Sequence, residues 1–349
     1  MTITEPTKSP TSTRTPTVPA TAELTLFELT MGVTVTQGIA IACRMELPDH
    51  LHAGHSSIAS LADAAGAKAD AVERVLRLLQ TVGIVEVVGD GAYRLTEFGD
   101  PLRADATPSV RAWALMSGSD WFWGPLGQLD ACFRDERSGF EVEYGAEVFD
   151  FLSQVPHAQA EYDAAMSGVM SSEASEIVAA QDFSDVRQIL DVGGGDGSLC
   201  RAILRAVPWL TAAVLDRPAV VEGARGQPSG PERCTWHGGD FFEHVPAGAD
   251  IYLLSRILHD WNDTRASVIL QQIGEAMRDD GTLLIVEQLL DENQRPFTPL
   301  CDLNMAALYG SRERNRSQMA DLLATAGFVM DRVVPLTSGR FLIEARRHV

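Results

Sequence analysis

Apolar positions divide the chain into four stretches that differ in period and composition. Residues 1–20 are rich in Thr, Pro and Ser and predict a disordered tail. Residues 21–110 carry apolar side chains mostly at helical spacing, and residues 111–180 form an aromatic-rich, helical linking segment. From residue 181 to residue 349 short apolar runs alternate with helical segments, which is typical of a parallel sheet.

Residues 21–110 predict a winged-helix domain. A capped helix over residues 56–66, a helix over residues 68–79 and a hairpin over residues 82–95 with an Asp-Gly turn follow one another, after one or two helices in residues 22–42. DNA binding is one use of such a domain, but residues 40–106 hold 6 Lys and Arg against 10 Asp and Glu. Because a groove-reading helix needs a positive face, a dimerisation role is favoured.

The linking segment, residues 111–180, supplies candidate pocket walls. Trp121 and Trp123 lie close together near an expected loop, while Met166 and Met170 follow one face of the helix that leads to the sheet. Core packing is the plainer explanation of all four. Flat aromatic rings and flexible thioethers also suit an irregular apolar ligand, so we expect these side chains to bind substrate.

The last stretch predicts a doubly wound, Rossmann-like α/β sheet. Expected strands are residues 186–192, 211–215, 234–237, 251–254 and 282–286, separated by helices, with a final pair at 329–335 and 340–346. The candidate polar residues fall at the carboxyl ends of these strands, where such sheets bind their ligands.

A glycine-rich turn, residues 193–197, follows the first expected strand and predicts a nucleotide-like ligand. Ser198 stands where a dinucleotide fingerprint has its third glycine, and Asp216 ends the second strand, where a carboxylate takes ribose hydroxyls. That acid suits either NAD or S-adenosylmethionine. Asp191 and Asp196 would repel a pyrophosphate but suit an ammonium and a sulfonium, and Asp240 with Phe241 suits an adenine ring. These residues favour S-adenosylmethionine.

His259 and Asp260 follow the fourth strand, on the same edge of the sheet as the glycines, and Glu287 ends the fifth strand. Methyl transfer to a phenol needs a base for the hydroxyl proton, and an imidazole oriented by a carboxylate can supply it. A cap residue is the simpler explanation of a His-Asp pair alone. The chain shows no acid cluster with metal-ligand spacing, so we expect no metal requirement.

Composition restricts the partners and the compartment. The net charge of −20 argues against nucleic acid as a main partner. Five scattered cysteines without a C-x-x-C pair indicate reduced thiols and a cytoplasmic protein. No apolar run reaches the roughly 18 residues that span a bilayer, and we expect no membrane partner.

The motifs LDVGGGDG, GGDFF, LHDWND and IVE behind a winged helix resemble the plant-type and bacterial small-molecule O-methyltransferase family, which includes caffeic acid and acetylserotonin enzymes. The resemblance implies a homodimer and His259 as general base between Glu287 and Glu313. Further candidate residues for binding the donor are Gly193, Gly195, Asp216, Asp240 and Phe241. Further candidates for binding the acceptor are Asp260, Asn304 and Met305. Many members carry a donor-contacting Lys where Ser255 stands here, with Arg256 next, so Ser255 and Arg256 are candidate donor contacts and Arg256 is the candidate substitute for that Lys.

The leading hypothesis is S-adenosylmethionine-dependent O-methylation of a hydroxylated aromatic small molecule in natural-product biosynthesis. Alternatives are a relative of the same fold that catalyses hydroxylation or decarboxylation, a winged-helix transcription regulator and, least favoured, an NAD-dependent dehydrogenase. His259, Glu287 and Glu313 together favour methylation over the other chemistries.

Overall fold

The computed structural model describes residues 26–135, 137–170, 173–225, 233–290 and 297–348, and the chain divides into two compact units, Met1–Asp100 and Pro101–Val349. The predicted tail, residues 1–20, lies outside the described residues. None of the helices within these ranges combines the length and the apolar character that crossing a membrane requires. The subdivision of the second unit at residue 180 stays a prediction.

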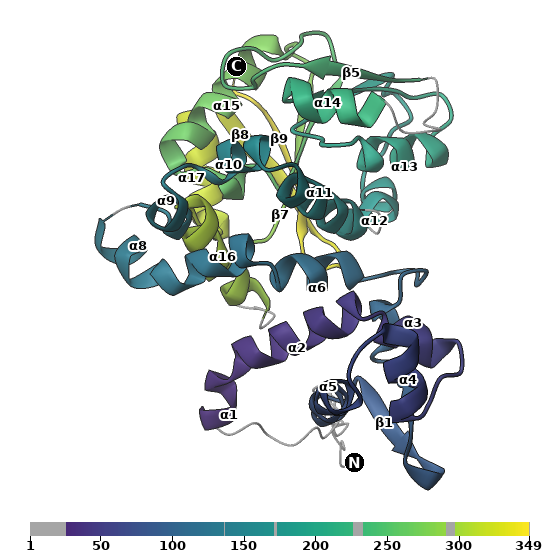
Figure 1. Cartoon of the computed structure of the whole chain (residues 1–349). Coiled ribbons are helices and arrows are strands. Elements are labelled where there is room, and N and C mark those ends of the chain that lie inside the picture. Colours follow the sequence, from purple (N-terminus) through teal and green to yellow (C-terminus); the bar gives the residue numbers. More distant parts are fainter. Residues whose placement is uncertain (1–25, 136, 171–172, 226–232, 291–296, 349) are drawn as a thin grey trace, which may run out of the picture. The chain divides into compact units, whose positions relative to one another are not determined.

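The first unit has the winged-helix architecture expected from its sequence (Figure 1). Ser57 caps its fourth helix by accepting a hydrogen bond from the amide of Ser60 at 3.1 Å, and Gly66 ends that helix with a left-handed φ of +61°. The α3 segment had no counterpart in the prediction. The elements are α1 (Leu26–Thr30), α2 (Gly32–Arg44), α3 (Leu47–His52), α4 (Ile58–Ala65), α5 (Ala69–Thr81), β1 (Val85–Val88) and β2 (Ala92–Leu95).

Short helices open the second unit and form its aromatic core. Phe140, Trp121 and Phe122 are buried there with Leu152, which explains most of the aromatic content of this stretch by packing. The helices are α6 (Arg111–Ser117), α7 (Asp120–Trp123), α8 (Leu129–Asp135), α9 (Gly139–Tyr144), α10 (Val148–Gln154), α11 (Pro156–Met170) and α12 (Glu173–Ala180).

A seven-stranded sheet follows in the order β5-β4-β3-β6-β7-β9-β8. Its first five strands are parallel, and β9 pairs antiparallel with both β7 and β8, so the expected edge hairpin is present with β9 on the inner side. The strands are β3 (Gln188–Val192), β4 (Thr211–Asp216), β5 (Cys234–Gly238), β6 (Ile251–Ser255), β7 (Thr282–Glu287), β8 (Phe328–Pro335) and β9 (Phe341–Arg347).

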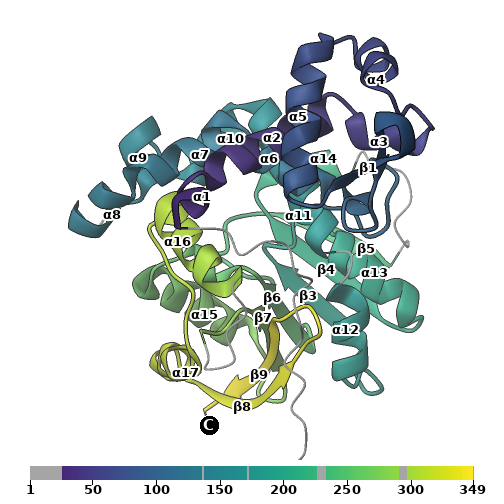
Figure 2. The same cartoon turned by 90° about the horizontal axis from the view of Figure 1, so that it is seen from below.

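Helices cover both faces of the sheet (Figure 2). Successive side chains of a strand point to opposite faces, and the strand residues on each face are mostly apolar, so both faces need to be buried. Leu190 and Val192 pack toward α15 (Asp263–Ala276) and α17 (Arg316–Thr325), whereas Ile189 packs toward α12 and α13 (Ser198–Ala206). The chain order reverses direction between β3 and β6, which opens a crevice at their carboxyl ends.

Three further elements surround that crevice: α14 (Pro218–Arg225), the short 3₁₀ turn η4 (Leu258–Asp260) and α16 (Phe297–Tyr309). The α16 helix was not predicted, although it carries Asn304 and Met305. Its apolar residues show little preference for one face, so the helical period is weak in the sequence.

Candidate active site

A cavity of about 1070 Å³ lies at the carboxyl ends of β3, β4 and β6, and all the residues that line it belong to the second unit. Helices α6, α10, α11 and α16 contribute side chains to its walls. This volume is at the upper end of the range for small-molecule sites, roughly 300–1,000 Å³. It has room for two small ligands side by side.

The glycine turn after β3 forms one end of the cavity. Gly193 and Gly195 have φ values of +78° and +58°, which favour glycine. A Cβ at Gly193 would overlap the Ile257 side chain, whereas a Cβ at Gly195 would meet no atom within 4 Å. The turn therefore leaves open space against the backbone for a ligand to approach closely.

Asp216 supports this turn from the end of β4. Its Oδ2 accepts a hydrogen bond from the Gly195 amide at 2.8 Å, and its Oδ1 accepts one from the Arg217 amide at 2.7 Å. Burial raises the pKa of the Asp216 carboxyl, and the two amide bonds partly offset that effect. The carboxylate is thus oriented at the rim of the cavity, where its remaining lone pairs suit the two hydroxyls of a ribose.

S-adenosylmethionine fits this end of the cavity. Asp163 and Asp196 line it and suit the ammonium and sulfonium charges of the donor, whereas Asp216 suits its ribose, and the ring of Phe241 lines it beside Asp240. Oδ1 of Asp240 accepts a hydrogen bond from the Phe242 amide at 2.8 Å, and this bond holds the loop that carries both residues in place. When bound here, the donor supplies an electrophilic methyl group on sulfur.

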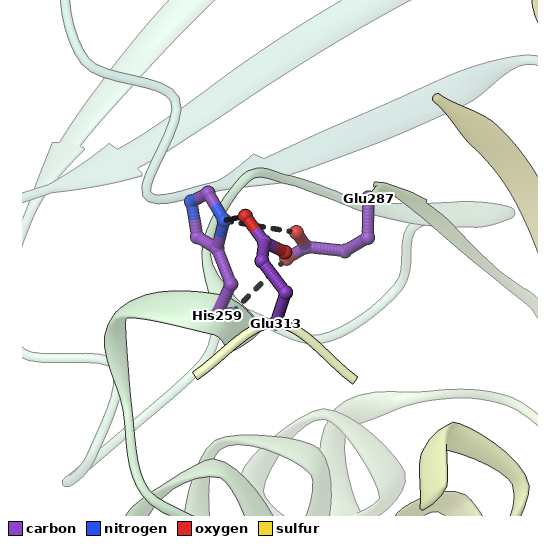
Figure 3. A group of neighbouring side chains, drawn as sticks. All are labelled: His259, Glu287 and Glu313. Atoms are coloured by element: carbon purple, nitrogen blue, oxygen red, sulfur yellow. Dashed lines mark hydrogen bonds and ion pairs between the residues drawn. The ribbon is translucent and has the colours of Figure 1, made fainter. Parts of the chain in front are cut away.

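His259 lies in η4 between β6 and α15, with its ring at the cavity wall. Nδ1 is 3.0 Å from Oε1 of Glu313 and 3.4 Å from Oε2 of Glu287 (Figure 3). Both glutamates are buried behind the ring and neither lines the cavity. Nδ1 therefore carries the hydrogen that Glu313 accepts, Glu287 adds a second negative charge beside it, and Nε2 is on the open side of the ring.

Glu287 also fixes the backbone that carries the imidazole. Its Oε1 accepts hydrogen bonds from the amides of Leu258 at 2.9 Å and His259 at 3.3 Å. The loop that holds Glu313 is tied to the same turn, because Arg314 donates to the carbonyl of Leu258 at 2.7 Å. Two segments 54 residues apart thus converge on one ring.

Burial alone would lower the pKa of His259, but the negative charges of Glu287, Glu313 and Asp260 outweigh it and raise that pKa to about 10. Burial raises the pKa of Asp260 to about 7, against the opposing charge of His259. Burial likewise raises the pKa of Glu287. The cluster therefore stabilises an imidazolium, the product of proton abstraction.

The same three side chains also have the composition of a metal site, since one atom each from His259, Glu287 and Glu313 lies within 4.8 Å of the others. Their contacts fit hydrogen bonding better. Nδ1 and Glu313 are separated by 3.0 Å, and the Glu287 oxygen Oε1 is already engaged by two backbone amides.

Aromatic rings form the other wall of the cavity. Phe149 packs against Trp261 and Tyr309 with centroids 5.6 and 5.5 Å apart, and against Tyr162 edge to face at 6.1 Å. The hydroxyls of Tyr162 and Tyr309 lie 3.4 Å apart. These flat apolar faces suit a planar acceptor and exclude water from the imidazole.

Most of the expected site residues meet in this one cavity. Those that line it are Gly193, Gly195, Asp216, Asp240, Phe241, Arg256, His259, Asp260, Met166, Asn304 and Met305. Glu287 and Glu313 do not line the cavity but lie beside His259, which does. Met170 lies in α11, but its side chain is outside the described part of the chain.

Two expected donor contacts, Asp191 and Ser255, do not line the cavity. Both belong to the strand face that packs on α12 and α13: the thiol of Cys200 lies 3.6 Å from Asp191, and Ser255 donates to Glu173 at 3.4 Å. Burial raises the pKa of Asp191 to about 7. The reason is the alternation of side chains along a strand, which sends these two residues beneath the rim.

The two tryptophans also lie elsewhere. The Trp121 indole donates to Glu161 at 2.9 Å within the aromatic core, and Trp123 is 38% exposed. Neither lines the cavity. Core packing, the plainer of the two interpretations, is correct for Trp121.

Several residues that line the cavity lie outside the set predicted from the sequence. Arg217 directly follows Asp216, and Gln288 directly follows Glu287. Polar residues at the carboxyl ends of strands are candidates for the site, so including one more position after each strand would have identified both. Phe149, Tyr309 and Arg340 arrive from α10, α16 and the β8–β9 turn. No local pattern marks them, because only the tertiary fold brings them there.

Sheet order, glycine turn and strand-end carboxylate together define an S-adenosylmethionine-dependent methyltransferase. Residues 126–329 match the O-methyltransferase domain model, and residues 27–104 match the O-methyltransferase dimerisation domain model. The chain belongs to the O-methyltransferase family, as its motifs predicted.

Similar proteins cover almost the whole chain. A mitomycin biosynthesis 6-O-methyltransferase of Streptomyces lavendulae is 35% identical over 94% of this chain and 95% of its own length. The human N-acetylserotonin methyltransferase structure with S-adenosylmethionine covers 93% of this chain and 97% of its own, at a TM-score of 0.85 and 28% identity. An O-methyltransferase from neocarzinostatin biosynthesis, solved with S-adenosylmethionine and 2-hydroxy-5-methyl naphthoic acid, covers 93% and 99% at a TM-score of 0.78 and 31% identity.

Proposed function

We propose that this S-adenosylmethionine-dependent O-methyltransferase acts on a hydroxyl group of a small aromatic acceptor in natural-product biosynthesis, with His259 as the general base. The observation that carries the proposal is the clamp of two buried glutamates on Nδ1 of His259, which leaves Nε2 toward the cavity. The mitomycin relative and the structure with a hydroxynaphthoic acid support this acceptor class.

The chain's own groups perform the acceptor half of the reaction. Nε2 of His259 accepts the hydroxyl proton as the acceptor oxygen attacks, and Glu313 and Glu287 stabilise the resulting imidazolium from the far side of the ring. A phenol has a pKa of roughly 10, close to the value of about 10 for His259. Proton transfer is therefore nearly balanced in free energy, which suits a general base.

The apolar walls assist the same step. Negative charge develops on the acceptor oxygen as its proton passes to His259, and a bound donor would carry a positive charge that is lost on methyl transfer. Phe149, Tyr309 and Met166 line the cavity and replace water around these charges. Asn304 and Asp260 lie on the same cavity and are proposed to orient the acceptor.

We also propose that the protein is a cytoplasmic homodimer that requires neither a metal ion nor nucleic acid. The dimerisation domain, residues 27–104, supports the dimer. Its acidic composition disfavours the alternative of DNA recognition. Size-exclusion chromatography with light scattering should give twice the mass of one chain, 37.8 kDa. A monomer that is fully active would contradict the proposed assembly.

The base assignment is tested with His259→Ala in an assay of a panel of phenols and hydroxyquinones by mass spectrometry. We expect methyl transfer to fall by roughly 10²- to 10⁴-fold, while donor binding measured by calorimetry is retained. The matched control is His237→Ala, because His237 is exposed on β5 and does not line the cavity. Near wild-type turnover by His259→Ala would show that another group removes the proton.

A further inference from the structure

Arg256 lines the cavity with a donor group that lacks an acceptor. Its Nη1 is buried and has no hydrogen-bond partner within the described residues, and its Nη2 meets only the sulfur of Met166 at 3.6 Å. The residue adopts a left-handed φ of +61°, which is unfavourable for Arg. A buried, unpaired guanidinium nitrogen on a strained backbone indicates that a ligand completes the site.

A second guanidinium, that of Arg340, reaches the cavity beside it. Arg340 from the β8–β9 turn is paired with the buried carboxylate of Glu173, and its pKa is lowered first by burial and then by the charge of Arg256. Ser255 shares that same carboxylate. The two guanidinium groups therefore lie close enough to interact, and Glu173 pairs with Arg340 while Nη1 of Arg256 keeps no hydrogen-bond partner among the described residues.

Gln288 adds an unsatisfied amide. Its Nε2 donates to the sulfur of Cys301 at 3.5 Å, while its Oε1 is buried without a partner among the described residues. The two ends of an amide are interchangeable in shape. With the amide reversed, the Cys301 thiol, whose pKa is raised by burial, donates to Oε1 and the NH₂ group takes the unpartnered position.

We propose that Arg256, Arg340 and Gln288 form a carboxylate-binding subsite and that the acceptor is a hydroxyarene that carries a carboxylate group. This rests on the proposed function, and it assigns roles to Arg340 and Gln288. Arg256 precedes His259 by three residues, and its charge acts on the pKa values of Asp260, Tyr162 and Tyr309. The subsite thus belongs to the end of the cavity that holds the base and the aromatic wall.

A carboxylate has two possible sources here, the acceptor and the methionyl group of the donor. Separate binding measurements distinguish them. The probes are a hydroxynaphthoate and the corresponding hydroxynaphthamide, each titrated by calorimetry in the presence of S-adenosylhomocysteine, and S-adenosylhomocysteine titrated alone. Binding alone is the readout, so the outcome does not depend on turnover.

We expect Arg256→Met to weaken hydroxynaphthoate binding by roughly 10- to 100-fold, as removal of a charge-assisted hydrogen bond does, and to leave hydroxynaphthamide binding unchanged. Arg256→Lys should restore part of the difference. Arg205→Met, on the exposed side of α13, is the matched control. The pair Glu173→Gln with Arg340→Gln removes the second guanidinium without leaving a buried carboxylate unpaired, and it should also reduce the preference for the carboxylate.

Equal losses for hydroxynaphthoate and hydroxynaphthamide would overturn the subsite. A loss confined to S-adenosylhomocysteine would keep a carboxylate contact but overturn its assignment to the acceptor. The proposed function fails by a different result: no hydroxyarene, with or without a carboxylate, is methylated by the wild-type protein.

Discussion

Removing one glutamate from the His259 clamp should change the pH dependence of the enzyme in a defined direction. In Glu313→Gln the amide oxygen still accepts from Nδ1, so the tautomer and the ring position are kept while one negative charge 3.0 Å away is lost. That charge favours the imidazolium and thus raises the pKa of His259 toward its value of about 10. Its removal must therefore lower that pKa.

The size of the change follows from the distance. An opposite charge within about 4–6 Å shifts a pKa by roughly 1–3 units, which corresponds to about 1.4 kcal/mol per unit. Glu287 remains at 3.4 Å and Asp260 at 3.5 Å from the ring nitrogens, so a raised pKa persists in part. We expect a decrease of about 1–3 units. The observed pKa belongs to the whole cluster rather than to one residue.

The assay is the pH dependence of kcat/KM with one accepted phenol. The wild type should gain activity as the pH rises toward about 10, because only the neutral imidazole acts as a base. Glu313→Gln should reach its maximum at lower pH, and this maximum should be lower because the base is weaker. Glu275→Gln, on the exposed side of α15, is the control. An ascending limb of the pH profile that does not move in Glu313→Gln would refute the electrostatic role of this carboxylate.

The remaining predictions concern the donor turn, the buried acid, the metal and stability. Gly193→Ala should raise the KM for the donor about tenfold or more, since φ is +78° there and a Cβ overlaps Ile257. Asp191→Asn should keep this KM within roughly threefold and raise Tm at pH 8, because its desolvated carboxyl is then ionised; a tenfold change in KM would return Asp191 to the donor site. EDTA should not reduce activity. A loss of activity in EDTA that one added metal ion fully restores would contradict this. The raised pKa of His259 contributes stability that is complete below about pH 6.5 and lost as the pH rises through about 10. Tm should therefore fall as the pH rises from about 6.5 to about 10, and equal slopes in the wild type and in His259→Asn would contradict this.

The local chemistry of the fold is determined by the sequence. Ser57 and Gly66 bound a helix, glycines with left-handed φ follow β3, and apolar runs mark the five parallel strands. These signals are short-range: caps, turns and periodicity act within a few residues. They were sufficient to predict the winged helix, the α/β sheet, the donor turn and the position of His259 at a strand end.

Only the tertiary structure decided which polar residues share the cavity. Asp191 and Ser255 occupy promising positions in the sequence, yet strand alternation turns both toward α12 and α13. Glu313 contacts His259 although the two are 54 residues apart in the sequence. Arg340 lines the cavity from the turn between the last two strands. Burial, long-range pairing and side-chain direction depend on how distant segments pack, and no local pattern encodes them.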